Sequence, residues 1–173
     1  MILTSRLQIL PCTLQYFEAL LQGKEALGHL LDIDIPLFWT EFPEIILVAY
    51  DKLRNDPSML GWFLYLVIHQ EDKRLIGAGG FKGRPDNDGV VEIGYEITTA
   101  YREMGFGTEL TQALIRFAFG HSYVTRVIAH TEEEYTASVK VLQKSGMSFA
   151  GENPDTQLWR WEITRAQYEL PQD

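Results

Sequence analysis

The sequence predicts a mixed α/β fold built around one central sheet. Two observations indicate it: a continuous apolar run of strand length at Trp62–Ile68, and apolar residues at three- and four-residue spacing from Leu110 to Ala118. A third is the order strand, helix, strand between Val90 and His130, which requires a crossover and therefore a parallel pair of strands. Parallel and antiparallel strands are thus expected in one sheet.

The first third of the chain predicts short elements. Arg6–Leu10 is expected to form a strand, and Thr13–Leu21 an amphipathic helix with its apolar residues on one face. Glycines, aspartates and a proline interrupt any period over Gln22–Phe42, so an irregular or short-helical stretch is expected there. A helix is then predicted around Glu44–Arg54.

The middle of the chain predicts three strands. Trp62–Ile68 is apolar throughout, which is typical of a central strand covered on both faces. Leu75–Phe81 is expected to be its hairpin partner, and three glycines in it indicate a bulge or the close approach of another group. After the loop Gly83–Gly89, Val90–Ile97 is expected to form the next strand.

The last third predicts a helix that ends near Gly120 and then smaller elements. These are a strand at Arg126–His130, a helix at Thr136–Lys144, and a closing hairpin of Met147–Ala150 with Gln157–Ile163.

The composition predicts one ordinary domain over residues 1–173, with 46% hydrophobic and 23% charged residues. The net charge of −9 is opposite to that of a general nucleic-acid binder. One cysteine, Cys12, excludes an intramolecular disulfide, and the four histidines show no metal-site spacing, so no metal is expected. The longest apolar runs fall far short of the ~20 residues that span a bilayer. With no secretory signal in Met1–Pro11, we expect a cytoplasmic monomer or homodimer without membrane contact.

The strongest local signal is Arg102–Thr108, which joins a strand to a helix. Its two glycines allow a ligand to approach the unpaired amides of the first helical turn, and those amides and the helix dipole attract phosphate. Arg102 would add a charge-assisted bond. The same glycines would equally suit a plain strand-to-helix turn, so the motif alone leaves both interpretations open.

Other phosphate-binding motifs fit less well. The chain contains no Gly-x-x-x-x-Gly-Lys-Ser/Thr string. A dinucleotide-binding fingerprint requires a third glycine where this chain has Leu110, although Glu132 would serve as its ribose-binding acid. A nicotinamide-binding protein is therefore a distant alternative.

An ordered set of segments resembles the GCN5-related N-acetyltransferase (GNAT) superfamily, most closely its branch that acetylates ribosomal proteins. The segments are Leu3–Leu7, Val91–Ile97, Arg102-x-x-Gly105-x-Gly107, Ala137-Ser138 and Val141–Met147. The likeness extends over nearly the whole chain and is weakest between Gly23 and Gly61.

The resemblance implies a central mixed, mostly antiparallel sheet of about seven strands with flanking helices. Its fourth and fifth strands would splay apart to admit the pantetheine arm of acetyl-CoA, with the pyrophosphate on the loop above. The residues that this implies for the cofactor are Ile97, Thr98, Arg102, Glu103, Met104, Gly105, Phe106, Gly107 and Thr108.

Acetyl transfer to an amine requires a neutral nucleophile, and an amine with a pKa near 10.4 is mostly protonated at neutral pH. A carboxylate is able to accept that proton. Glu92 and Glu96 share one face of a strand, with Gly94 between them leaving room. Glu92 is the first candidate because related enzymes often have an acid at its position. Either glutamate would otherwise simply face solvent.

The proton donor to the leaving thiolate is predicted from the resemblance. Many relatives have a tyrosine four residues before the glycine that corresponds to Gly146, where this chain has Leu142. The ribosomal branch has a serine where Ser138 stands, so Ser138 is expected to be the donor, or else to support the start of its helix. Tyr135 replaces a common asparagine and is a further candidate, as a donor or by stacking near the pantetheine.

We therefore expect an acetyl-CoA-dependent N-acetyltransferase that moves the acetyl group directly from the thioester to a primary amine, either a protein N-terminus or a small amine. The alternative is a CoA-binding sensor or scaffold with little or no turnover, since Tyr135 and Leu142 depart from the family pattern.

Overall fold

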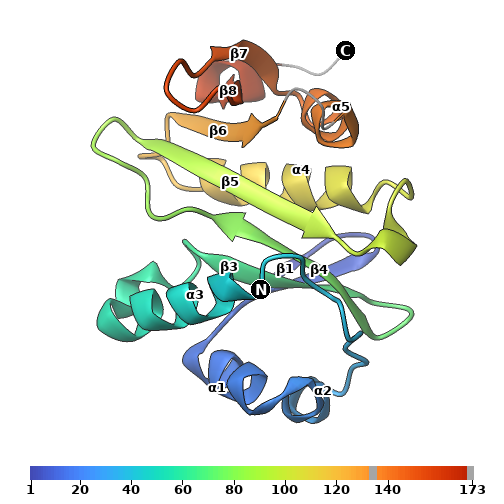
Figure 1. Ribbon diagram of the computed structural model, residues 1–173. Coiled ribbons are helices and arrows are strands. Elements are labelled where there is room, and N and C mark those ends of the chain that lie inside the picture. The colour runs from blue at the N-terminus through green and yellow to red at the C-terminus, as the bar shows by residue number, and fades with distance from the viewer. Residues whose placement is uncertain (133–135, 171–173) are drawn as a thin grey trace.

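The computed structural model describes residues 1–132 and 136–170 (Figure 1). The strands are β1 (Ile2–Leu3), β2 (Leu7–Pro11), β3 (Leu64–His69), β4 (Arg74–Phe81), β5 (Val90–Ile97), β6 (Arg126–Thr131), β7 (Ser148–Glu152) and β8 (Trp159–Thr164). The helices are α1 (Leu14–Gln22), α2 (Lys24–Leu31), α3 (Glu44–Asn55), α4 (Phe106–Phe119), α5 (Thr136–Lys144) and α6 (Arg165–Tyr168). Within the described ranges, no helix combines the length and the apolar character that crossing a membrane requires.

All of these strands join one eight-stranded sheet in the order β1-β2-β3-β4-β5-β6-β8-β7. Neighbouring strands are antiparallel except β5 and β6, which are parallel because α4 connects them. The predicted mixed, mostly antiparallel sheet is therefore confirmed. The eighth strand is the two-residue β1, which the sequence pattern is too short to reveal.

Helices pack on both faces of the sheet (Figure 1). On one face, α1, α2 and α3 contribute Phe17, Leu27 and Leu53 to a core over β2, β3 and β4. On the other face, α4 and α5 contribute Leu114 and Leu142 to a second core. Burial of each such side chain stabilises the fold by about 1.5–3 kcal/mol relative to exposure.

β3 carries both cores, as its unbroken apolar run predicts. Leu66 and Val67 are adjacent and fully buried, yet they belong to cores on opposite faces. The observed strand begins at Leu64, two residues after the predicted start at Trp62. The chain is still in a turn at Trp62, since Gly61 has a φ of 85° and the Trp62 amide donates to the Met59 carbonyl at 2.8 Å.

One glycine of β4 confirms the predicted close approach. At Gly80, which has a φ of 144°, an added Cβ would lie 1.8 Å from the Phe63 carbonyl oxygen. Only glycine allows β3 and β4 to approach this closely at that position.

The parallel pair separates along its length. β5 and β6 pair only through Val90↔Arg126, Val91↔Val127 and Glu92↔Ile128, and no pairing follows although β5 continues to Ile97. These are the fourth and fifth strands of the sequence prediction, so the predicted splay is confirmed.

The splay leaves main-chain groups of β5 without a strand partner. The Glu92 carbonyl accepts from the Lys82 amide and the Thr98 amide donates to the Ile76 carbonyl, so both point toward β4. Alternate residues of a strand direct their main-chain groups to opposite sides. Ile93, Tyr95 and Ile97 therefore direct theirs toward the gap beside β6.

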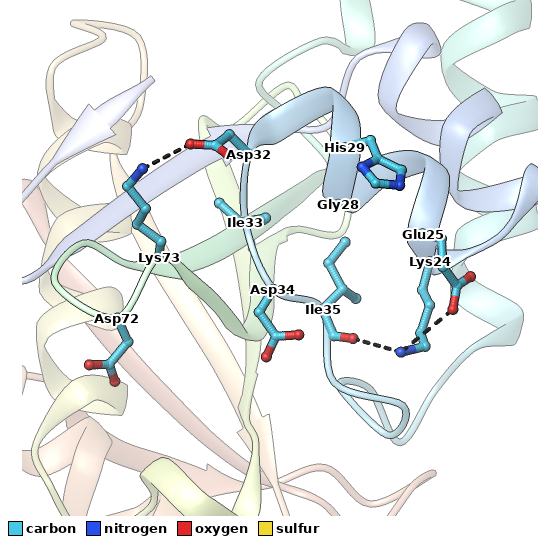
Figure 2. Close-up of a pocket in the computed structure, with 10 residues that line it drawn as sticks. All are labelled: Lys24, Glu25, Gly28, His29, Asp32, Ile33, Asp34, Ile35, Asp72 and Lys73. Atoms are coloured by element: carbon cyan, nitrogen blue, oxygen red, sulfur yellow. Dashed lines mark hydrogen bonds and ion pairs between the residues drawn. The ribbon is translucent and has the colours of Figure 1, made fainter.

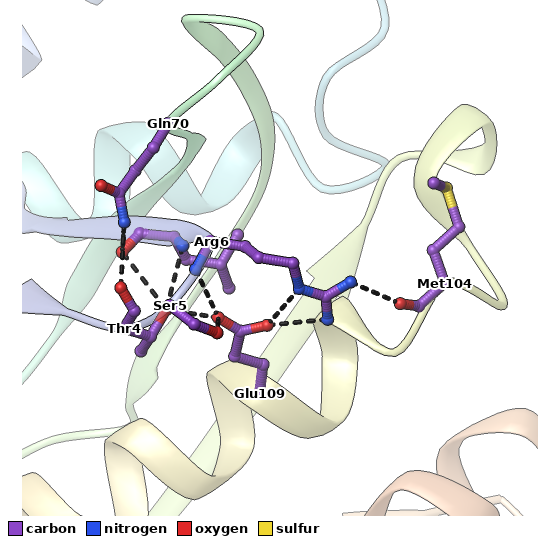
Figure 3. Close-up of polar contacts among 7 residues, drawn as sticks. Thr4, Ser5, Arg6, Gln70, Met104 and Glu109 are labelled. Atoms are coloured by element: carbon purple, nitrogen blue, oxygen red, sulfur yellow. Dashed lines mark hydrogen bonds and ion pairs between the residues drawn. The ribbon is translucent and has the colours of Figure 1, made fainter.

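A polar network fastens the turn between β1 and β2 to the first turn of α4 (Figure 3). The Glu109 carboxylate accepts from the Thr4 hydroxyl at 2.6 Å, the Arg6 amide at 2.9 Å and the Arg6 guanidinium at 2.7 Å. The Arg6 guanidinium also donates to the Met104 carbonyl at 2.9 Å and lies 4.1 Å from the centre of the Phe106 ring. The start of α4 is thus held by Thr4 and Arg6, which lie between 98 and 105 residues away from their partners in the sequence.

The network shifts the titration of Glu109. Burial by itself would raise the pKa of this carboxyl, but hydrogen bonds from Thr4, Arg6 and Ser5 outweigh burial and lower the pKa. Because the folded-state pKa is below the unfolded value, the ionised carboxylate stabilises the fold above the unfolded pKa, near 4.3. That contribution is lost as the pH falls through the folded-state pKa.

We expect Glu109→Gln to reduce the free energy of unfolding at pH 7 by about 1–2 kcal/mol, since it removes a charge-assisted hydrogen-bond acceptor that is partly solvent-screened. Urea unfolding of both proteins from pH 7 to pH 3 measures it, with Glu18→Gln on the exposed side of α1 as control. The difference from wild type should shrink below a pH of about 4.3. A difference independent of pH would contradict the assignment.

Candidate functional site

A cleft of about 640 Å³ opens where β5 and β6 separate. Its walls come from α3 and from Phe42 just before that helix, from β3 and β4, from the diverging strands β5 and β6, and from α5. The side chains that line it include Phe42, Ile45, Val48, Lys82, Tyr95, Glu96, His130, Ser138 and Leu142. Most of the surface is apolar. Its polar side chains come from β5 and β6, from Lys52 of α3, from Lys82 after β4 and from Ser138 of α5.

The start of α4 has the geometry of an anion site. Gly105 is the N-cap residue in a left-handed conformation with a φ of 85°, and no side chain caps the helix. Glu103 is also left-handed, with a φ of 62°, so the loop turns sharply into the helix. The amides of the first turn have no intrahelical acceptors and carry the positive end of the helix dipole.

The first turn of α4 lies against the splayed strands. At Gly107 an added Cβ would lie 3.3 Å from Val141 of α5 and 4.0 Å from the Tyr95 ring of β5. A side chain here would press into the space between α5 and β5. Glycine therefore leaves a path from the helix N-terminus to the open edge of β5, as a diphosphate joined to a pantetheine arm would require.

The other residues implied for the cofactor have varied surroundings. Arg102 donates from Nε to the Ile97 carbonyl at 2.9 Å and forms an ion pair with Glu41, so its guanidinium ties the end of β5 to the loop before α3. Phe106 is buried, which leaves only its main chain for a ligand, whereas Met104 is exposed. The Thr98 amide is bonded within the sheet, but its buried hydroxyl has no partner.

Glu96 holds the segment before α3. One oxygen of its carboxylate accepts from the Thr40 hydroxyl at 2.5 Å and the other from the Glu41 amide at 2.9 Å. Burial raises the pKa of this carboxyl, and the two hydrogen bonds oppose the rise. Both oxygens are therefore engaged in positioning this wall of the cleft.

Glu92 contacts two cleft-lining groups. Its Oε1 is 2.9 Å from Nδ1 of His130 on β6, and the same oxygen forms an ion pair with Lys82. No atom of the described residues lies within 4 Å of a Cβ built at Gly94, between the two glutamates, so among these residues the expected room is present. The two glutamates share a strand face, but only Glu92 lies at the point where the strands separate.

Ser138 is the third residue of α5, and its side chain lines the cleft. Beside it, the Tyr95 hydroxyl donates to the Ser138 carbonyl at 3.3 Å, and burial raises the pKa of Tyr95 to about 12. The phenol therefore stays protonated at neutral pH. Leu142 is fully buried at the wall and offers no proton donor. The remaining candidate, Tyr135, falls outside the described residues.

The sequence interpretation missed His130 and Tyr95. In the sequence, His130 is considered only as one of four histidines without metal-site spacing, whereas its side chain is only 15% exposed and contacts Glu92. A usable signal was its position, since a histidine near the end of the strand after a parallel crossover lies at the ligand-binding edge. Tyr95 occupied an apolar strand position and gave no polar signal.

A second cavity, of about 510 Å³, lies between α2, the segment after it and the turn from β3 to β4 (Figure 2). Several of its charged side chains are paired: Lys73 donates to Asp32 at 2.8 Å, Lys24 lies 3.7 Å from Glu25, and Asp34 pairs with Arg74 at 3.2 Å. It contains none of the predicted site residues, so we place the candidate site in the cleft at the splay.

Comparison with known sequences points to one family. A family model described as an acetyltransferase (GNAT) domain matches residues 37–148. The chain is 27% identical over 120 residues to the uncharacterized N-acetyltransferase YjdG of Bacillus subtilis, covering 69% of this chain and 71% of that protein. It is 33% identical over 102 residues to the uncharacterized N-acetyltransferase p20 of Bacillus licheniformis, covering 56% of this chain and 57% of that protein.

Solved structures show the same fold. A spermidine N-acetyltransferase from Vibrio cholerae in complex with CoA and spermine has a TM-score of 0.69 at 13% identity, covering 95% of this chain and 99% of that one. RimL, a ribosomal L7/L12 α-N-protein acetyltransferase in complex with CoA, has a TM-score of 0.68 at 13% identity, covering 93% and 95%. An acetyltransferase (GNAT family) from Bacillus anthracis has a TM-score of 0.65 at 22% identity, covering 97% and 99%.

The predicted fold and superfamily are confirmed, and placement in the ribosomal-protein branch stays a prediction. Since the family model covers more than half of the chain, and curated N-acetyltransferases match much of it, this chain belongs to the GNAT family of N-acetyltransferases.

Proposed function

We propose that this protein, as a single domain, transfers an acetyl group from acetyl-CoA directly to a primary amine in the cleft between α3, β5 and β6. The observation that carries the proposal is the uncapped, glycine-built N-terminus of α4 beside the open edge of β5. Anion binding and strand-like hydrogen bonding thus lie next to each other, as a diphosphate followed by an amide-containing arm would use them. Two of the structural neighbours hold CoA.

The proposed assignments follow from this placement. The amides of Gly105, Phe106, Gly107 and Thr108 bind the diphosphate, together with the loop residues Arg102, Glu103 and Met104, while Ile97 and Thr98 contact the arm. The Arg102 guanidinium contacts the Ile97 carbonyl through Nε and Glu41 through one terminal nitrogen, so we propose that it either binds a phosphate directly or positions the loop.

The reaction moves an acyl group from sulfur to nitrogen. The amine lone pair attacks the thioester carbonyl, a C–N bond forms, the C–S bond breaks, and CoA leaves as a thiolate. Edge amides of β5 are placed to donate to the oxyanion, which gains most from donors fixed in advance. The proton of the ammonium leaves on the Glu92 side of the cleft, to Glu92 itself or to a group that it contacts, with Glu96 as the second candidate. Ser138 supplies a proton to the thiolate and regains one from solvent. Tyr135 is proposed as a further donor.

The lining of the cleft suggests the acceptor class. Phe42, Ile45 and Val48 give the α3 wall a mainly apolar surface, with Lys52 as its charged lining residue, and polar groups of β5 and β6 also line the cleft. We propose a primary amine attached to an apolar body, such as a protein N-terminus with an apolar first residue, in preference to a polyamine. The predicted cytoplasmic location and the monomer or homodimer state stay predictions.

Turnover with purified full-length protein tests the proposal. Acetyl-CoA is mixed with a peptide bearing a free apolar N-terminal residue, with an aromatic ethylamine or with spermidine, and free thiol and acetylated product are measured. We expect thiol release with the peptide or the aromatic amine, and a lower kcat/KM with spermidine. Tight binding of acetyl-CoA without turnover on any amine would instead support a sensor or scaffold, which the buried Leu142 in place of a tyrosine favours.

We expect Thr108→Asp to weaken acetyl-CoA binding about tenfold or more, equivalent to ~1.4 kcal/mol, because it places a negative charge beside the diphosphate amides. The same charge in a first helical turn stabilises the helix, so the melting temperature should not fall. Calorimetric titration measures the affinity, and Gln143→Glu, exposed on α5, is the control with an equal charge change. Unchanged affinity would remove the cofactor site from this turn.

We expect Ser138→Ala to lower kcat about 10- to 100-fold, because the thiolate loses its nearest proposed proton donor. The affinity for acetyl-CoA should stay unchanged, since the arm binds to β5. Steady-state kinetics and calorimetry measure the two quantities. Full activity in this variant would transfer the role to another group, with Tyr95 as the next donor to replace by phenylalanine.

A further inference from the structure

We propose that His130 is the catalytic base of this site and that Glu92 acts through it as a positioning residue. This rests on the proposed function, since it assigns the proton transfer within that reaction. The juxtaposition that carries it is a carboxylate–imidazole pair joining β5 to β6 at the residue where the two strands part.

The sheet brings these two residues together. Glu92 is the last residue of β5 paired with β6, opposite Ile128, and His130 follows Ile128 on the same strand face. The distance between His130 Nδ1 and Glu92 Oε1 is 2.9 Å. The pair therefore bridges the two strands where their main-chain hydrogen bonds end.

The pairing fixes which nitrogen is free. A carboxylate oxygen accepts hydrogen bonds, so Nδ1 carries the shared proton and donates it to Glu92. In the neutral imidazole, Nε2 is then the unprotonated nitrogen. His130 lines the cleft, whereas Glu92 is not among the lining residues and contacts two of them, His130 and Lys82. An acceptor amine in the cleft would thus meet the imidazole before the carboxylate.

The charged groups around the imidazole come from three strands. Glu92 approaches from β5, and Lys82, after β4, pairs with the same Glu92 oxygen. Arg160 of β8 is the register partner of His130 and forms an ion pair with Glu162. Arg160 thus has a carboxylate partner of its own, whereas Lys82 shares the Glu92 oxygen with the imidazole, and Glu92 is the only acid in contact with His130 among the described residues.

The proton balance of the step is complete. The ammonium of the acceptor gives one proton to Nε2 of His130, and the resulting imidazolium is stabilised by the Glu92 carboxylate across Nδ1. The free amine attacks the thioester, and its second N–H proton leaves to solvent as the amide forms. The thiolate takes a proton directly from solvent or from Ser138, which regains one from solvent. His130 returns its proton to solvent before the next turnover.

The test compares His130→Ala, Glu92→Gln and the control His29→Ala, whose site is exposed on α2. With whichever amine of the panel wild type acetylates, we expect kcat/KM to fall about 100-fold in His130→Ala, the scale of a lost general base. Glu92→Gln should lose about 10- to 100-fold, as expected for a group that orients another. Acetyl-CoA affinity and melting temperature should stay near wild type, and the control should keep full activity.

Two readouts separate catalysis from structure. The wild-type rate should fall at acid pH, because an imidazole that already holds a proton accepts no other. In His130→Ala, this decrease of the rate at acid pH should disappear. Added imidazole should restore part of the activity of His130→Ala and none of the activity of Glu92→Gln. An unchanged pH profile in His130→Ala, or no rescue by imidazole, would overturn the proposal.

A third measurement does not depend on turnover. In protein with ¹⁵N-labelled histidine, the His130 signal, identified by its loss in His130→Ala, should report the tautomer protonated at Nδ1 in wild type. It should change in Glu92→Gln, whose amide presents a different partner. A wild-type His130 protonated at Nε2 would refute the assignment even with full turnover. Absence of turnover on every amine, with the expected tautomer present, would instead refute the proposed function.

Discussion

The separation of β5 from β6 after three residue pairs is the constraint on which the site depends. Pairing along the whole of β5 would give the Tyr95 main chain a partner within the sheet and close the cleft, whereas the Ile97 carbonyl already accepts from Arg102. The fold leaves the Tyr95 edge without a strand partner at a cost, because unpaired main-chain groups in a protein interior are unfavourable. A ligand with its own amide groups recovers that cost when it binds as an additional strand.

The stability of the anion-binding turn comes from outside it. The backbone of this turn is left-handed at Glu103 and Gly105, and its amides are uncapped, so the turn itself contributes little. The Arg6–Glu109 network clamps it from the opposite end of the chain while leaving those amides free (Figure 3). A rigid support with unsatisfied donors is the arrangement that binds an anion with little reorganisation.

The two strand glutamates show how surroundings separate similar residues. Both lie on the same face of β5, yet Glu96 has both oxygens bonded to the segment before α3, whereas Glu92 contacts an imidazole and an ammonium. The first arrangement fixes a wall of the cleft. The contacts of Glu92 link two titratable side chains that line the cleft, those of His130 and Lys82.

The sequence by itself determined the elements and the loop. Apolar periodicity placed most helices and strands, since burial on one or two faces dictates the spacing. It did not delimit α2 within the stretch expected to be irregular or short-helical, and it missed β1 and α6, which are too short to show a period. The glycines of Arg102–Thr108 identified the anion-binding turn because its chemistry belongs to the local backbone. Only the tertiary structure decided the partners: Arg102 with Glu41, Glu96 with Thr40, and His130 with Glu92, 38 residues apart. Local pattern carries no record of such contacts, because they depend on how strands and loops distant in sequence pack against each other.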